Sequence, residues 1–190
     1  REFAARMMGP AISELITLFP STVLTINSYE NGTEEALLKG QIDVSIDCDR
    51  PNDPEIGYKL ILDEPMIAVC GKNFFKAHKE KIANKNYFNL PYLLCERLHP
   101  DKILSRLENH SGVVAKFNDI ATTRAACIEG IGWSLLPKYA IQKELEAKTL
   151  IQIDTANYGK SKYGVWWIRN RNYLKGTVDK INGWLNQKEL

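Results

Sequence analysis

Three loops of the sequence carry polar side chains that could bind a small molecule. Each loop follows a predicted strand and leads into a predicted helix, whose unpaired N–H groups favour an anion or a carboxylate. Arg97 could add a bidentate partner for that carboxylate. The candidate ligand-binding residues are Asn31, Gly32, Thr33, Cys95, Glu96, Arg97, His99, Asn118, Asp119 and Ile120. Helix capping alone is the alternative explanation for the Asn, Asp and Thr residues among them.

The histidines and acidic residues form no convincing catalytic set. His78, His99 and His110 lie in polar surroundings, and no G-x-S-x-G, H-E-x-x-H or P-loop pattern occurs. Of the three histidines only His99 falls in a candidate binding loop. Asp43 and Asp47 lie on one side of a predicted strand, but Asp43 is better explained by the preceding turn than by general acid catalysis. We therefore expect no enzymatic activity and no catalytic residue.

The four cysteines do not have the spacing of a metal site. Cys48, Cys70, Cys95 and Cys127 are 22, 25 and 32 residues apart, without a C-x-x-C pair. Free cysteines in apolar segments usually behave as small buried hydrophobic residues, which suits a reducing cytoplasm. We expect no metal, no cofactor and a cytoplasmic location.

The composition is that of a globular protein. The chain has 190 residues, of which 44% are hydrophobic and 25% charged, and its apolar runs are far shorter than a membrane span. The formal net charge is only +2, which is low for a domain that binds nucleic acid through phosphate contacts. We expect no membrane contact and no DNA binding by these residues.

The elements that must position the candidate residues alternate between helix and strand, which indicates an α/β fold. Apolar residues at intervals of three and four predict a first helix that ends before Pro20, and Gly40 and Gly130 are predicted to end later helices. Predicted helices cover residues 5–19, 34–39, 101–109, 120–129, 137–146 and 174–185. Predicted strands cover residues 23–29, 42–46, 58–70, 92–95, 113–117, 133–136, 151–153 and 163–168.

Two segments resemble each other at an offset of 90 residues. T-E-E-A-L-L-K-G-Q-I-D-V-S-I from Thr33 aligns with T-R-A-A-C-I-E-G-I-G-W-S-L-L from Thr123, with one Thr, one Ala and one Gly identical. Each segment follows a β-rich run and a polar loop. Chance similarity is one explanation, but two similar α/β lobes with a cleft between them account for the shared order of elements.

Motifs along nearly the whole chain resemble a known family. They are F-P at 19–20, L-L-K-G-Q-I-D-V-S-I at 37–46, P-N-D-P at 51–54, E-P at 64–65, E-G-I-G-W-S-L-L-P at 129–137 and V-W-W-I-R at 165–169. In this order they resemble the effector-binding domain of LysR-type transcriptional regulators. The helix-to-strand segment with G-Q-I-D and the segment with G-I-G-W-S-L-L-P are the most specific of them.

The resemblance implies two Rossmann-like subdomains joined by two crossing strands, as in type 2 periplasmic binding proteins, with a small effector bound in the interlobe cleft. The first lobe would comprise residues 1–67 plus 164–190, and the second residues 68–163. The crossing strands would fall on 67–70 and 163–167. The family's N-terminal winged helix-turn-helix domain, which binds DNA, is expected to be absent from this fragment.

The family's binding loops fall on 31–33, 95–98 and 118–121, but the sequence departs from the family in two places. The first strand of the family and the Ser/Thr-bearing loop after it fall before or at Arg1. The segment Glu96-Arg97-Leu98-His99-Pro100 replaces the usual small, Gly-rich loop. Both departures leave the effector's identity open.

The resemblance also implies an assembly. The helix from Ala5 to Leu18 would pack against the helix from Ile120 to Glu129 of a second copy, giving an antiparallel homodimer, with a tetramer expected at full length. The alternative to this interface is that the apolar stripe of the first helix packs only in the chain's own core.

An extracytoplasmic solute-binding protein, or an enzyme on the same two-lobed scaffold, remains the alternative function.

Overall fold

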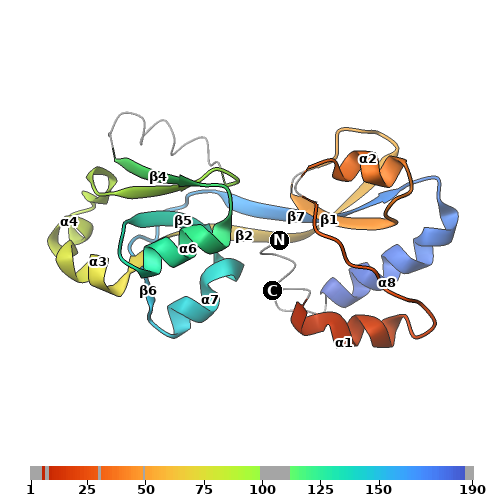
Figure 1. Cartoon of the computed structure of the whole chain (residues 1–190), viewed down its shortest axis with the longest axis horizontal. Coiled ribbons are helices and arrows are strands. Elements are labelled where there is room, and N and C mark those ends of the chain that lie inside the picture. The colour runs from red at the N-terminus through yellow and green to blue at the C-terminus, as the bar shows by residue number, and fades with distance from the viewer. Residues whose placement is uncertain (1–5, 7–8, 30, 49, 99–111, 187–190) are drawn as a thin grey trace. The chain divides into compact units, whose positions relative to one another are not determined.

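A computed structural model describes residues 6, 9–29, 31–48, 50–98 and 112–186 (Figure 1). The predicted helix 101–109, together with His99, His110 and the first residues of the predicted helix 5–19, lies outside the described residues. The chain divides into two compact units, one formed by residues 3–63 with 162–190 and the other by residues 64–161.

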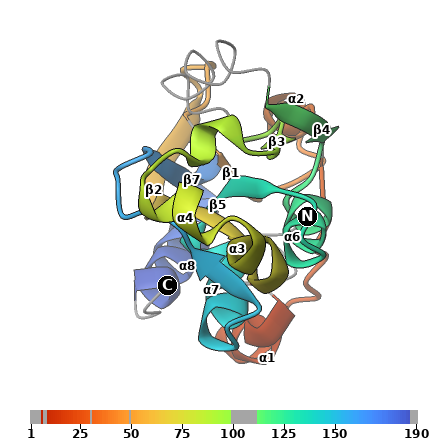
Figure 2. The ribbon, with the colours of Figure 1, turned by 90° about the vertical axis from the view of Figure 1, so that its left-hand side faces the viewer.

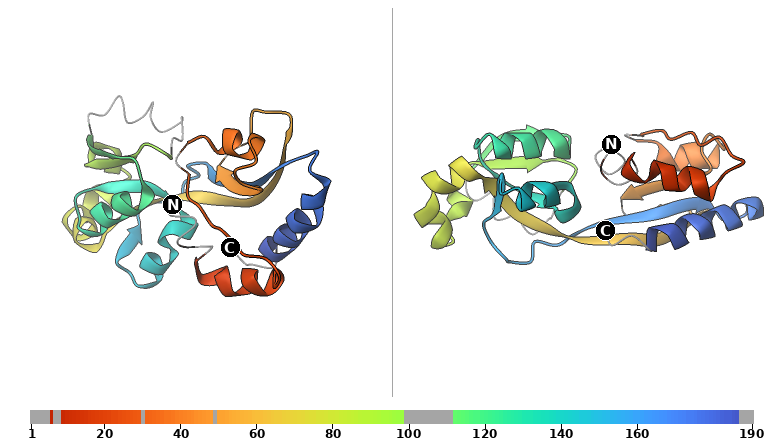
Figure 3. Two further views of the ribbon diagram at one scale, coloured as in Figure 1. Left: turned by 45° about the vertical axis from the view of Figure 1, so that its right-hand side comes forward. Right: turned by 90° about the horizontal axis from the view of Figure 1, so that it is seen from below.

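The first unit packs three helices around a small sheet. Its helices are α1 (Gly9–Leu18), α2 (Thr33–Leu38) and α8 (Lys175–Asn186), the last preceded by the short 3-10 helix η3 (Asn172–Leu174). Strand β1 (Val44–Cys48) pairs antiparallel with β7 (Lys160–Ile168), and β7 lies beside β2 (Ile56–Gly71). Helices α1 and α8 lie side by side (Figure 3). Leu15 and Trp184 join them in one apolar core, and the Trp184 Nε1–H donates to Glu14 at 2.9 Å.

Two glycines let aromatic rings lie directly on the strands of the first unit. A Cβ atom at Gly57 would come within 2.4 Å of the Trp167 indole, and one at Gly164 within 2.0 Å of the Tyr58 ring. No side chain can occupy such a space. The rings therefore take the places that side chains at 57 and 164 would need, and this pairing brings β2 and β7 into close contact.

The second unit is built around a mixed sheet in the order β2-β5-β3-β4, with β6 on the other side of β2 (Figure 2). Strand β3 is parallel to β4 and β5, and β2 is antiparallel to β5 and β6. Its strands are β3 (Tyr92–Cys95), β4 (Val113–Phe117), β5 (Trp133–Pro137) and β6 (Leu150–Gln152). Its helices are α3 (Lys72–Ala77), α4 (Lys79–Ala83), η2 (Tyr87–Asn89), α6 (Ile120–Ile128) and α7 (Lys138–Glu146). Trp133, fully buried, lies at the centre of an aromatic core with Tyr87 and Tyr92.

Polar contacts hold both ends of the second unit in place. The buried Glu64 carboxylate accepts the backbone N–H of Tyr139 at the start of α7 at 2.9 Å. Near the other end of the unit, the Met66 N–H donates to the Gly159 carbonyl at 3.0 Å. The Asp154 carboxylate accepts hydrogen bonds from the hydroxyls of Tyr87 and Tyr158. Burial acts to raise the pKa of Asp154, but these hydrogen bonds lower it below its ordinary value.

The repeated segments end their helices in the same way. In α2 the Gly40 N–H donates to the Leu37 carbonyl and the next N–H donates to Ala36. After α6 the Gly130 N–H donates to the Cys127 carbonyl and the next N–H donates to Ala126. Both glycines are left-handed, with φ of +73° and +81°. These are Schellman motifs, and each leads directly into a strand of its unit.

Three sequence-based expectations were wrong in detail. Residues 23–29 form no strand; Val23 is 94% exposed, and this segment pairs with no strand in the described part of the chain. The strand expected at 42–46 begins at Val44, because the N–H of Ile42 still donates to the carbonyl of Ala36. Pro137 ends β5 and precedes α7 as its N-cap, so it does not form the first helical turn.

No helix among the described residues is long and apolar enough to cross a membrane.

Gly130→Ala should lower the free energy of unfolding by about 1–2 kcal/mol, the cost of a left-handed residue with a Cβ atom. The nearest atom to a Cβ at Gly130 is 3.6 Å away, so the loss would come from the backbone and not from a clash. Urea denaturation measures it. Gly176→Ala in α8 is the matched control, because nothing lies within 4 Å of its Cβ position; there alanine should be neutral or stabilising. Equal losses in both variants would contradict the proposed role of φ at Gly130.

Candidate functional site

The carboxyl ends of β3 and β4 lie together at one edge of the second unit. The strands are parallel, with Cys95 opposite Phe117, and the Glu96 N–H donates to the Phe117 carbonyl at 2.8 Å. The loop after β3 and the loop that leads into α6 therefore start at the same point. Ligands of open α/β sheets bind at such edges.

Asp119 is the N-cap of α6. Its Oδ1 accepts the Thr122 N–H at 2.7 Å, and the Thr123 hydroxyl donates to the Asp119 carbonyl at 2.7 Å. The hydrogen bond from the Thr122 backbone is the main reason that the pKa of Asp119 is lowered, and Arg97 adds a smaller electrostatic contribution. The cap already accepts one of the backbone N–H groups that this helix end could offer to a ligand. An anion bound here would therefore need a cationic side chain as a further partner.

Arg97 is a cation whose charge reaches this helix end. It is exposed, and it forms no ion pair with any residue that the structure describes. Its charge acts on Asp119 and on the Cys95 thiol. The positive charge of Arg97 is therefore within electrostatic reach of the α6 N-cap.

Cys95 and Ile120 lie below this edge and not on it. Cys95 is 2% exposed and Ile120 is 6% exposed. Burial raises the pKa of the Cys95 thiol, while a hydrogen bond with Thr123 acts in the opposite direction. A neutral buried thiol is not a nucleophile. These two residues support the edge, and of the candidate residues that the structure describes there, Glu96, Arg97 and Asn118 are exposed.

The candidate residues of the first unit surround the start of α2. Gly32 is the N-cap residue, with φ +79°, and no side chain caps the helix. Asn31 is exposed and Thr33 is buried. Glu34 accepts hydrogen bonds from the backbone and side chain of Asn52, which fixes this end of the helix to the loop after β1.

The structure thus brings together six of the ten predicted residues, four at the edge (Glu96, Arg97, Asn118 and Asp119) and two buried beneath it (Cys95 and Ile120). Asn31, Gly32 and Thr33 belong to the first unit, and His99 lies outside the described residues. Capping explains Asp119 alone among the polar candidates. Thr123, which contacts both Asp119 and Cys95, was not predicted, although its alignment with Thr33 in the repeat could have indicated it.

No group of three or more His, Cys, Asp or Glu side chains among the described residues is arranged to hold a metal ion.

The two α/β units, with β2 running through one boundary between them and β7 through the other, define the class of periplasmic-binding-protein-like ligand-binding folds. The chain belongs to the LysR substrate binding domain family, whose model matches residues 1–182. It is therefore the effector-binding domain of a LysR-type transcriptional regulator. No match was found among curated proteins.

Solved structures with the same fold are regulator domains. The reduced form of OxyR from Neisseria meningitidis has a TM-score of 0.75 and 20% identity, over 98% of this chain and 91% of that one. The effector domain of AmpR from Pseudomonas aeruginosa has a TM-score of 0.74 and 13% identity, over 98% and 90%. The regulatory domain of CrgA from N. meningitidis has a TM-score of 0.70 and 12% identity, over 97% and 95%. These likenesses establish the fold, and the family is one of regulator domains and not of enzymes.

Asp119→Ala should lower the free energy of unfolding at neutral pH by about 1 kcal/mol, the usual loss for an N-cap. Asp119→Asn, which keeps an acceptor, should lose less. Because the pKa of Asp119 is lowered in the folded state, the stabilisation from its charge is present above the unfolded value of about 3.9 and is lost as the pH falls through the folded pKa. Urea titrations at neutral and acidic pH measure both effects. A gap between wild type and Asp119→Asn that does not shrink on acidification would contradict the charge's role.

Proposed function

We propose that this domain senses a small anionic metabolite and passes its presence to DNA through the N-terminal domain of the full-length regulator in the cytoplasm. The observation that carries the proposal is the exposed Arg97, which forms no ion pair with any described residue and acts on the N-cap of α6, where β3 and β4 end. A carboxylate accepts two parallel hydrogen bonds from a guanidinium, and the helix end adds a favourable partial positive charge.

In this proposal, exposed residues contact the effector and less exposed residues position them. Arg97 binds the charged group, and the exposed Glu96 and Asn118 contact polar groups on the rest of the effector. Cys95, Asp119 and Ile120 hold these residues in place. As the family resemblance implies, His99 and the Asn31, Gly32 and Thr33 segment of the first unit add further contacts. The effector would bind without being converted, because the described residues of this edge include no activated nucleophile.

The effector can be sought by screening carboxylate and phosphate metabolites for thermal stabilisation of the chain. A ligand at 100 times its Kd should add about 2.7 kcal/mol to the free energy of unfolding. Each positive compound is then recovered after incubation and checked by mass spectrometry. Recovery of a converted product would contradict binding without turnover.

Arg97→Ala should weaken any carboxylate effector found in this way by about 1.5–3 kcal/mol, the range for a hydrogen bond to a charged group. Titration calorimetry measures the change. Lys143→Ala, which removes an exposed cation from α7 of the same unit, is the matched control and should leave the affinity unchanged. An unchanged affinity in Arg97→Ala would place the effector elsewhere.

We further propose that α1 and α6 form the interface of a homodimer and that the full-length protein forms a tetramer. On α1, Leu15 is 5% exposed and packs in the core, whereas Ile12 and Ile16 are 44% and 57% exposed. The helix thus presents one apolar face to its own unit and a second one to solvent. Ile131, three residues after the end of α6, is also 52% exposed. Two equivalent α1–α6 contacts would cover both surfaces.

Ile16→Glu should therefore dissociate the dimer at micromolar concentration, since it removes about 2 kcal/mol of apolar burial per contact and buries a charge. Sedimentation velocity measures the oligomer. Ser13→Glu, an exposed position of the same helix, should leave the dimer intact. A wild-type chain that sediments as a monomer, or a Ser13→Glu variant that dissociates equally, would reject this interface.

A further inference from the structure

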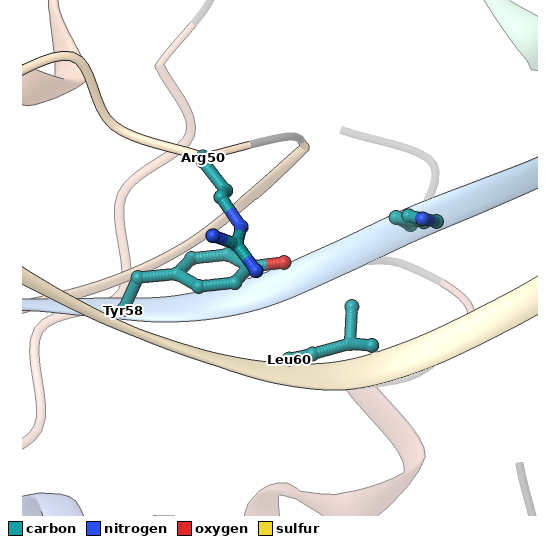
Figure 4. A pocket seen from close by; sticks show the side chains of 4 residues that line it. Arg50, Tyr58 and Leu60 are labelled. Carbon is teal, nitrogen blue, oxygen red and sulfur yellow. The ribbon is translucent and has the colours of Figure 1, made fainter.

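The first unit contains a hollow that is separate from the β3–β4 edge. Its volume is about 270 Å³, and it is lined by Arg50, Tyr58, Leu60 and Lys162 (Figure 4). All four residues belong to the first unit. Sites for drug-sized ligands span about 300–1,000 Å³, so this hollow suits a smaller molecule.

Two strands build the floor of the hollow. Tyr58 and Leu60 are two residues apart on β2 and share one face, as Lys162 and Gly164 do on β7. The Tyr58 ring occupies the space over Gly164, where a Cβ would lie 2.0 Å from it. The ring is therefore held flat against β7 and offers its other face to the hollow.

Arg50, in the loop after β1, covers that face. Its guanidinium carbon lies 5.4 Å from the centre of the Tyr58 ring, within the range of a cation–π contact. Figure 4 shows Arg50 reaching over the ring while Leu60 rises from β2 toward the same space. A guanidinium that packs on a ring can still donate hydrogen bonds from its edge.

The two cations of the hollow have no acidic partner among the residues that the structure describes. Neither Arg50 nor Lys162 forms an ion pair with any of these residues, and none of those that line the hollow is acidic. Two like charges facing one space repel each other, and a bound anion would remove this repulsion. Packing of Arg50 on Tyr58 explains the position of one cation but not the presence of the second.

We propose that this hollow is a second ligand site, which binds a small monocarboxylate with a compact apolar body. Arg50 binds the carboxylate through its planar donors, and Lys162 adds a second positive charge. Leu60 packs against the apolar part of the ligand, together with the edge of the Tyr58 ring. The site lies wholly within the first unit. It is independent of the effector site proposed around Arg97, and either can fail without the other.

The probe is 4-fluorophenylacetate, followed by its own fluorine NMR signal during titration with the 190-residue chain. An aromatic carboxylate of this size should bind with a Kd of about 1 mM, from the usual free energy per heavy atom. The uncharged amide of the same acid tests the need for charge and should bind about tenfold more weakly. Acetate tests the need for an apolar body and should not compete at equal concentration.

Variants locate the probe. Arg50→Ala should weaken binding of the probe about tenfold, because it removes a charged hydrogen-bond donor. Lys162→Ala should weaken binding about threefold, because it removes a charge without a direct hydrogen bond in a partly open site. Lys59→Ala is the matched control, because Lys59 lies between Tyr58 and Leu60 and points to the other face of β2. It removes the same charge and should leave the affinity unchanged. Arg97→Ala should also have no effect.

Four results would overturn the proposal. They are no binding of the probe, equal binding of the acid and the amide, the same loss in Lys59→Ala as in Arg50→Ala, and loss of binding in Arg97→Ala alone. The third result would indicate attraction to the general positive charge of the surface, and the fourth would assign the probe to the edge of the second unit.

Discussion

The contact on which the rest of the molecule depends is the packing of aromatic rings onto bare backbone between β2 and β7. Trp167 lies against Gly57 and Tyr58 against Gly164, each at a distance that leaves no room for a Cβ atom. The chain passes between its two units at Asp63/Glu64 and Ser161/Lys162, within these same two strands. The ring–glycine pairs therefore fix the strands that carry the chain from one unit into the other. They also hold the Tyr58 ring flat, and the hollow beneath Arg50 exists because of it.

A second constraint is the way each unit changes from helix to strand. A left-handed glycine ends α2 and another ends α6, with the same pair of backbone hydrogen bonds. Because these bonds close the helix at a set residue, the strand that follows begins at a set place. In the second unit this fixes the start of β5. Because β3 pairs with β5, it also fixes where β3 ends at Cys95 and where the exposed Arg97 follows. The site residues are thus positioned by backbone geometry several residues away from them.

Much of the fold could be predicted from the sequence because its signals are local. The glycines at 40 and 130 marked both helix ends, and the run from Val113 to Phe117 was assigned to the strand it forms. The strand predicted at 23–29 was wrong, because a β-rich composition does not indicate whether a partner strand lies beside the segment. In the site, Asp119 could be predicted because capping is a local pattern, but Thr123 reaches Cys95 only through the fold. The hollow could not be foreseen, because Tyr58 and Lys162 are 104 residues apart.

The second unit is one uninterrupted segment, whereas the first is assembled from two. Its ends are drawn together by the hydrogen bond between Met66 and Gly159, and Glu64 is tied to the start of α7. Folding of this segment alone therefore brings the two halves of the first unit within reach of each other. Closing a free loop of the 98 residues from Glu64 to Ser161 would cost about 4 kcal/mol in chain entropy. The inserted unit meets that cost with its own contacts, so β1 and β7, far apart in the chain, pair as if they were neighbours.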